Sequence, residues 1–154
     1  MVNIQVDQIY TLRNFQGGTV LDLHGGDKKS IIGYGNNGGS NQAWIFEHRG
    51  ERWSIKSVSS GKYLGVDGQI RDGTKLVAVS TIFMWDIKDS DVQGIRICVF
   101  AHDKEFSVDL SNYGDGTSGT AVHLWSSWPG ANQIWTLVPR KMIASPTEQN
   151  SRIM

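Results

Sequence analysis

The sequence predicts an all-β domain built from three similar units. Three observations support this: the composition, the alternating hydrophobic pattern and an internal repeat. The chain has 154 residues, enough for one domain of ordinary size with a core of its own. Eighteen glycines, six tryptophans, five phenylalanines and four tyrosines stand against only four glutamates and six alanines. That composition is poor for helices and favours strands joined by many turns.

The repeat is clearest when two segments that end in tryptophan are aligned at that residue. Residues 18–44 overlay residues 105–135, so that Asn-Gln-Ala-Trp at 41–44 matches Asn-Gln-Ile-Trp at 132–135. If each unit has about 45 residues, a length common among repeat architectures, a third copy fits between these two.

The middle copy begins at residue 61 and ends at Trp85, where the Asn-Gln pair is missing. Gly65 takes the place that Asp22 and Asp109 have in the other two copies. We therefore predict a single domain and a polar C-terminal tail, with the domain at 1–140 and the tail at 141–154. Within the domain we expect units at about 8–50, 51–92 and 93–139.

Each unit is predicted to contain four short strands. The first strands alternate apolar and polar residues, as half-buried strands do, at 10–13, 53–56 and 95–99. Turns are expected after them, at Gly17-Gly18, Ser60-Gly61 and Asp103-Lys104. The second strands are expected at 20–23, 63–66 and 107–110, and the third at 30–34, 75–79 and 121–125. A fourth strand begins at each repeated tryptophan, and no segment shows helical periodicity.

Three units that end in this tryptophan, two of them with the full Gln-x-Trp motif and an aspartate on the second strand, resemble the ricin B-type β-trefoil lectins. They look most like the small single-domain lectins of mushrooms and other fungi. The resemblance covers about Tyr10 to Val138, with full motifs at 42–44 and 133–135 and a degenerate one at Trp85. It implies a six-stranded barrel closed by three hairpins, with pseudo-threefold symmetry. It also implies a cytosolic, often dimeric protein that binds glycans in fungal defence.

The same resemblance implies a shallow sugar site in each unit that has the required side chains. An aromatic ring stacks on the apolar face of a galactose-like sugar, a carboxylate accepts from its hydroxyls, and an amide both donates and accepts. The candidate carbohydrate-binding residues of the first unit are Asp22, Gly25, Tyr34, Asn37, Asn41 and Gln42. Those of the third unit are Asp109, Trp125, Asn132 and Gln133. The middle unit has Gly65, Val79 and Ile82-Phe83 at these positions, so we predict that it binds no sugar.

Several of these residues also have a purely structural explanation. We expect the tryptophans of the Gln-x-Trp motifs to lie in the core. Gln42 and Gln133 can either brace a loop or touch the sugar, and Trp128 can either rim the third site or be an ordinary surface residue. The polar loop around Asp115 is not expected to bind a metal.

Charge and motifs argue against other functions. Fifteen basic and fifteen acidic residues leave no net charge, which argues against nucleic-acid binding, and no apolar stretch is long enough for membrane insertion. The Gly-x-Gly-x-x-Gly match at 33–38 is not followed by the helix that a dinucleotide site needs. The four histidines and the single Cys98 lack zinc-ligand spacing, and the histidines are interpreted as solvated residues. We expect no enzyme activity, no cofactor and no metal.

We therefore expect a lectin for galactose, N-acetylgalactosamine or their disaccharides, with mannose left open. Its partners would be glycans and glycoproteins, together with a second copy of the chain in a homodimer. A cytoplasmic location is expected because the sequence shows no signal peptide, no disulfide and no N-glycosylation acceptor. Two alternatives remain. One is a companion subunit of another protein, such as a mushroom tyrosinase, that has lost sugar binding. The other is a trefoil protease inhibitor.

Overall fold

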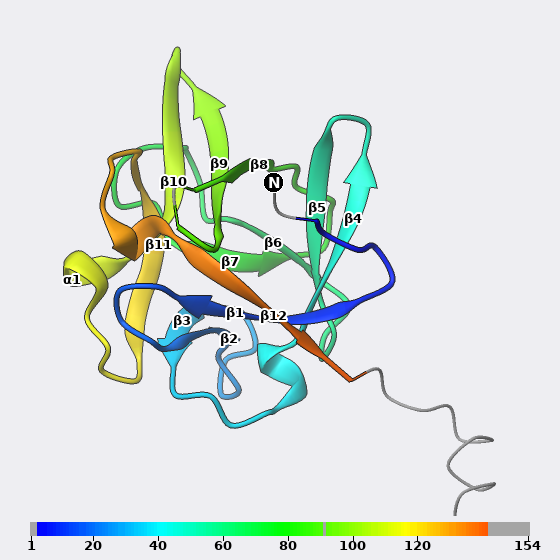
Figure 1. Cartoon of the computed structure of the whole chain (residues 1–154). Coiled ribbons are helices and arrows are strands. Elements are labelled where there is room, and N and C mark those ends of the chain that lie inside the picture. Colours follow the sequence, from blue (N-terminus) through cyan, green and yellow to red (C-terminus); the bar gives the residue numbers. More distant parts are fainter. Residues whose placement is uncertain (1–2, 91, 142–154) are drawn as a thin grey trace, which may run out of the picture.

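The computed structural model describes residues 3–90 and 92–141, and over these ranges its regular secondary structure consists almost entirely of β-strands (Figure 1). The first predicted unit contains β1 (Ile9–Asn14), β2 (Val20–Leu23), β3 (Ile31–Tyr34) and β4 (Trp44–Arg49). The second contains β5 (Arg52–Ser57), β6 (Tyr63–Val66), β7 (Leu76–Val79) and β8 (Asp86–Asp89). The third contains β9 (Ile95–Ala101), β10 (Lys104–Leu110), β11 (Thr120–Ser126) and β12 (Trp135–Arg140). The predicted tail lies outside the described residues, apart from Lys141.

The first and last strands of each unit form a barrel of six. β1 pairs with β4 and β12, β4 pairs with β5, and β9 pairs with β8 and β12. The remaining link joins Trp53 on β5 to Trp85, the residue before β8, through two backbone hydrogen bonds of 2.9 and 2.7 Å. The barrel expected from the resemblance is therefore present.

The three remaining strand pairs, β2–β3, β6–β7 and β10–β11, are hairpins, and each contacts the next. The contacts that join them pair Ser30 with Val77, Lys75 with His123, and Ala121 with Ile32. The last of these ladders also closes a ring of seven strands in the order β12-β9-β10-β11-β3-β2-β1. Because the same contact recurs between each pair of units, the fold has the predicted pseudo-threefold symmetry.

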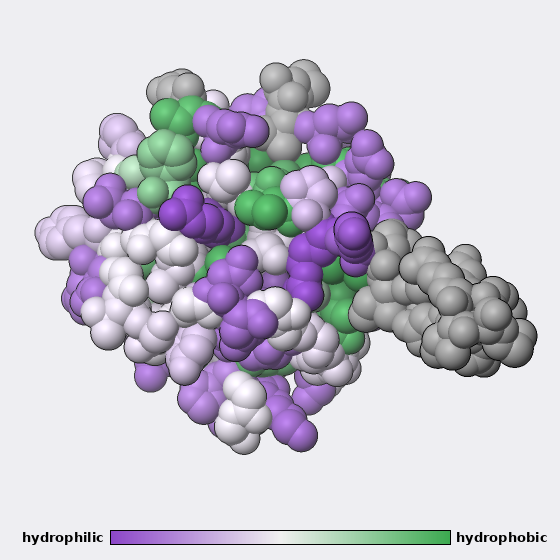
Figure 2. Space-filling view, turned by 60° about the horizontal axis from the view of Figure 1, so that its bottom comes forward, coloured by the Kyte–Doolittle hydropathy of each residue, from purple (hydrophilic) through white to green (hydrophobic). Residues whose placement is uncertain are grey.

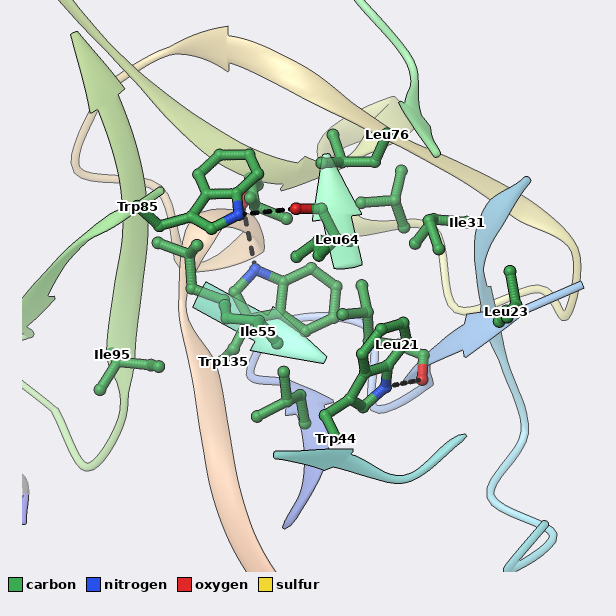
Figure 3. Packing of buried hydrophobic residues seen from close by; sticks show 14 of the residues in the cluster. Leu21, Leu23, Ile31, Trp44, Ile55, Leu64, Leu76, Trp85, Ile95 and Trp135 are labelled. Carbon is green, nitrogen blue, oxygen red and sulfur yellow. Dashed lines mark hydrogen bonds between the residues drawn. The ribbon is translucent and has the colours of Figure 1, made fainter. Parts of the chain in front are cut away.

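The tryptophan that ends each repeat lies in the core, as predicted. Trp44, Trp85 and Trp135 have no exposed surface, and their indole rings lie close together at the centre of the cluster in Figure 3. Each indole N–H donates to a main-chain carbonyl of its own unit, on Leu21, Leu64 and Val108, at 3.0, 3.0 and 3.1 Å. A buried N–H without an acceptor is costly, so these bonds fix the orientation of each ring.

The turn between β9 and β10 differs slightly from the prediction. It lies at His102 and Asp103, whose φ angles are 54° and 58°, while Lys104 already belongs to β10. Two successive positive φ angles are typical of the type I′ hairpin, whose twist matches that of the flanking strands. The turn is therefore one residue earlier than the expected Asp103-Lys104.

The face of the molecule in Figure 2 is mostly hydrophilic or neutral, with small separate hydrophobic patches. The buried apolar side chains gather in one cluster around the three core tryptophans. Within 3–90 and 92–141, no helix is long and apolar enough to cross a membrane.

Candidate functional sites

Asp109 lies at the floor of the candidate site in the third unit. It is on β10, directly opposite His123 on β11, and its Oδ1 lies 3.0 Å from Nε2 of His123. Its Oδ2 accepts a hydrogen bond of 3.0 Å from Nε2 of Gln133. Asp109 is almost fully buried, and a buried carboxylate needs such partners because isolated burial of charge is costly.

Gln133 fixes the orientation of Asp109 from beneath the surface. It ends the 3-10 turn η2 (Ala131–Gln133). Its Nε2 also donates to the carbonyl of Ser126, and its Oε1 accepts from the backbone N–H of Trp128, both at 3.1 Å. The side chain is fully buried. Of the two roles that the sequence left open for Gln133, the structure therefore favours bracing over contact with a ligand.

Asn132, also on η2, lies at the edge of the same site. Its Nδ2 donates to the carbonyl of Leu110 at 3.1 Å. Its Oδ1 is one of two buried side-chain polar atoms in the described part of the chain without a hydrogen-bond partner, the other being Oγ1 of Thr19. An unpaired buried acceptor costs about 1–3 kcal/mol, and Asn132 carries this cost at a position that lines the pocket above Asp109.

A pocket of about 450 Å³ opens above Asp109 and Asn132. Trp125 and His123 form one wall, stacked with ring centroids 5.5 Å apart. Trp128 forms another wall and receives Tyr113 edge-on at 6.2 Å. Trp125 is 43% exposed and Trp128 42%. The volume is within the range of about 300–1,000 Å³ typical of small-molecule sites.

The segment α1 (Ser111–Gly114), next to the β10–β11 hairpin at one side of the molecule (Figure 1), departs from the sequence prediction. No helix was expected there, and the structure has a single turn in which Asn112 and Tyr113 adopt φ angles of 54° and 55°. Such left-handed backbone is uncommon outside glycine and costs about 1–3 kcal/mol per residue. The turn holds Tyr113 82% exposed beside Trp128.

The first unit repeats the floor of this site. Oδ2 of Asp22 accepts from Nε2 of Gln42 at 2.8 Å, and Oδ1 accepts from Nδ2 of Asn41 at 3.2 Å. Asn41 also donates to the carbonyl of Leu23 at 3.0 Å, as Asn132 does in its own unit. Gln42 is fully buried, so it too braces the carboxylate and is not placed to touch a ligand.

Tyr34 is the exposed aromatic residue of the first unit. It pairs across the hairpin with Val20, two residues before Asp22, as Trp125 pairs with Ser107 two residues before its own aspartate. Tyr34 is 43% exposed, the same fraction as Trp125. The alignment of the two aromatic positions is therefore confirmed by the strand register.

Asn37 and Gly25 lie in loops beside the first site and make no hydrogen bond to Asp22 in the structure. The backbone N–H of Asn37 donates to Oε1 of Gln42 at 2.9 Å, and its Oδ1 accepts from the N–H of Gly39 at 2.8 Å. The side-chain oxygen of Asn37 is thus engaged in its own loop. Gly25 lies exposed in the turn after β2, where Nδ1 of His24 accepts the backbone N–H of the next glycine at 2.9 Å.

The middle unit lacks the floor of the other two. A side chain at Gly65 would start 2.6 Å from Cγ2 of Val79, so Val79 occupies the space that an aspartate would need. This unit instead contributes to the neighbouring site, because Oδ1 of Asp72 accepts from the N–H and Oγ of Ser126 at 2.6 and 2.7 Å.

His123 and Tyr113 are the most informative of the third-site residues that the sequence reasoning missed. His123 was interpreted as a solvated histidine, but it is mostly buried between Asp109 and Trp125. The strand register was the signal that could have found it, because His123 faces Asp109 once the hairpin is aligned. No such signal pointed to Tyr113, because its position depends on the left-handed backbone at Asn112 and Tyr113, which the sequence does not predict.

Electrostatics separate Asp22 from the exposed aspartates. Burial raises the pKa of Asp22 above the usual value, opposed by the hydrogen bond from Gln42, the nearby His24 and the hydrogen bond from Asn41. By contrast, hydrogen bonds from Ser30 and from the backbone N–H of Lys29 lower the pKa of the exposed Asp27 to about 2. The carboxylate of Asp22 therefore takes up a proton more readily than an ordinary aspartate as the pH falls.

The structure gives little support for a nucleophilic cysteine or for a metal site. Burial raises the pKa of the Cys98 thiol to about 11, so the thiol remains protonated at neutral pH and is a poor nucleophile. In the part of the chain that is described, no group of three or more His, Cys, Asp or Glu side chains could hold a metal ion.

Three hairpins on a six-stranded barrel, with the same aspartate, asparagine and glutamine arrangement in two units, define a β-trefoil with two equivalent polar sites. The family model for the ricin-type beta-trefoil lectin domain-like proteins matches residues 3–79 and 40–125. The chain belongs to this family. A comparison with curated proteins found no match.

Solved structures agree with this assignment. The ricin B-like lectin of Macrolepiota procera, solved in complex with lactose, is 44% identical with a TM-score of 0.82, over 88% of this chain and 98% of that one. The agglutinin of Rhizoctonia solani is 28% identical with a TM-score of 0.80, over 91% of this chain and 99% of that one. The designed threefold symmetric protein ThreeFoil is 25% identical with a TM-score of 0.76, over 84% and 97%. The resemblance to small fungal lectins is thereby confirmed.

Proposed function

We propose that the protein is a non-enzymatic lectin that binds the terminal galactose or N-acetylgalactosamine of glycans at the first and third units. One observation carries this proposal: both units hold a braced aspartate and an asparagine beside a half-exposed aromatic ring, and the middle unit has none of these. The lactose in the Macrolepiota procera structure contains galactose, which supports the same class of sugar here.

The chemistry of the third site suits a pyranose with neighbouring hydroxyls. An ionised carboxylate has about four acceptor positions, and the contacts of Asp109 to His123 and Gln133 use two of them. The others can accept from sugar hydroxyls in charge-assisted bonds, which are the stronger kind. Asn132 lines the same pocket, and Trp125 offers a flat apolar surface for the C–H face of the ring.

A single shallow site of this kind is expected to bind with a Kd of about 1 mM, equivalent to about −4 kcal/mol. Two sites on one chain raise the effective affinity for a surface that displays many copies of the sugar. The protein should therefore bind dense glycan surfaces much more tightly than it binds free monosaccharides. The homodimer, the cytoplasmic location and the role in fungal defence remain predictions.

A glycan array with the purified protein tests the proposal directly. The parent protein should bind galactose- or N-acetylgalactosamine-terminated glycans, and the double variant Asp22→Ala/Asp109→Ala should bind none of them. A blank array from a folded parent protein would contradict the proposal and favour a companion subunit that has lost sugar binding. Binding only to mannose-terminated glycans would correct the sugar class.

The raised pKa of Asp22 predicts a pH dependence for the first site. Sugar hydroxyls need the ionised carboxylate, so affinity should fall, as the pH is lowered, at a higher pH than the usual pKa of 3.8 would give. The free energy of unfolding should change in the opposite direction and rise as the pH is lowered through the raised pKa of Asp22. The folded state takes up the proton more readily than the unfolded chain, because protonation removes the cost of burying the charge. Titration of an Asp109→Ala variant with methyl β-galactoside at several pH values measures the first effect. A loss of affinity whose midpoint lies at or below pH 3.8 would contradict this prediction.

A further inference from the structure

The two candidate sites have equivalent floors, each an aspartate braced by a glutamine, but their walls differ. The backbone N–H of Asn37 donates to Gln42 in the first unit, and that of Trp128 donates to Gln133 in the third. The two hydrogen bonds are equivalent, so Asn37 and Trp128 occupy the same position in their units. A polar side chain in one site is thus replaced by a large aromatic ring in the other.

The turn after the second strand differs in the same direction. In the first unit this turn holds the imidazole of His24 against the backbone of Gly26. In the third unit it holds Tyr113, which is 82% exposed on left-handed backbone. An exposed ring adds little to the core, and the conformation that projects it costs free energy. Such strain is often found at ligand sites, and here it places a ring at the mouth of a pocket.

The pocket of the third unit therefore has two separate aromatic surfaces. Trp125, stacked on His123, lies with Asp109 in the part of the pocket that provides hydrogen-bond acceptors. Trp128 and Tyr113 pack edge to face at 6.2 Å and form a second wall. One pyranose ring that hydrogen-bonds to Asp109 needs only the first surface. The second surface is suited to the apolar face of a ring joined to that sugar.

We infer that the third site binds a disaccharide unit, whereas the first site binds a single terminal sugar. The terminal ring lies against Trp125 and hydrogen-bonds to Asp109, and the adjoining ring packs on Trp128 and Tyr113. This inference rests on the proposed function, and it makes the two sites of one chain different in specificity.

The test compares methyl β-galactoside with lactose in an Asp22→Ala protein, where only the third site remains. Lactose should bind more tightly, and Trp128→Asn, which installs the residue of the first unit, should weaken lactose binding about fivefold. The affinity for methyl β-galactoside should change less than twofold. Tyr113→Asn, which keeps a residue tolerant of left-handed backbone, should give a smaller loss in the same direction.

An Asp109→Ala protein provides the matched control, because in its remaining first site the two ligands should bind equally. Thermal unfolding and an NMR spectrum check that each variant is folded. If Trp128→Asn does not fold, the effect of Tyr113→Asn on lactose affinity is the test. Equal affinities for the two ligands in the third site, or no effect of the aromatic substitutions on lactose, would overturn the inference alone. Failure of both ligands to bind the Asp22→Ala protein would instead contradict the proposed function.

Discussion

Replacing Asp109 by alanine is expected to abolish sugar binding at the third site while the protein remains folded. The carboxylate is the only anionic acceptor among the residues that line the pocket. Loss of two charge-assisted hydrogen bonds, at about 1.5–3 kcal/mol each, lowers affinity by about a hundredfold or more. A site with a Kd of about 1 mM would then fall below detection. Ligand-observed NMR with lactose in an Asp22→Ala background measures this loss.

The fold should tolerate this change because Gln133 keeps its hydrogen bonds to Ser126 and Trp128. We expect a modest decrease in melting temperature, from the lost contacts of the carboxylate. Asp67→Ala is a suitable control, since Asp67 is an exposed carboxylate in the middle unit and should leave lactose binding unchanged. Lactose binding by Asp109→Ala with parental affinity would refute the assignment of this site.

Replacing Trp135 by alanine is expected to lower the free energy of unfolding by about 3–5 kcal/mol, the range for removal of a large aromatic side chain from a core. The side chain is fully buried, and its indole donates to the carbonyl of Val108, directly before Asp109. The substitution thus leaves a cavity and an unpaired carbonyl beneath the third site. Since small domains have only about 5–15 kcal/mol of stability, this variant should be close to unfolding at 37 °C. Urea denaturation measures the change.

Two further tryptophan variants separate the effect of burying the ring from that of the indole hydrogen bond and from that of removing an exposed tryptophan. Trp135→Phe keeps most of the ring volume but loses the hydrogen bond, so it should cost less than the alanine variant. Trp128→Ala removes a side chain that is 42% exposed and should cost less than about 1 kcal/mol. Similar losses for Trp135→Ala and Trp128→Ala would show that Trp135 does not have the core role assigned to it.

The fold could be predicted from the sequence because the information is repeated three times. Each copy places turn residues, alternating strands and a terminal tryptophan at matching positions, and three copies of one unit must pack in equivalent ways. Trp85 illustrates this: it is fully buried and bonded like its two counterparts although its unit has lost the Asn-Gln pair. The aspartate and aromatic positions of the sites were predictable for the same reason, since they follow the alignment of the repeats.

The parts that are not repeated could be decided only by the tertiary structure. The role of Gln42 and Gln133 depends on burial, and a sequence pattern cannot distinguish an amide beneath a carboxylate from one beside it. His123 belongs to the third site because the strand register places it opposite Asp109. Asp72, from the middle unit, contributes by accepting a hydrogen bond from Ser126. Tyr113 depends on two left-handed residues that neither composition nor spacing indicates. The sequence by itself therefore determined the trefoil and the floor of its two sites. The walls that make these sites different arise from irregular backbone and from contacts between units.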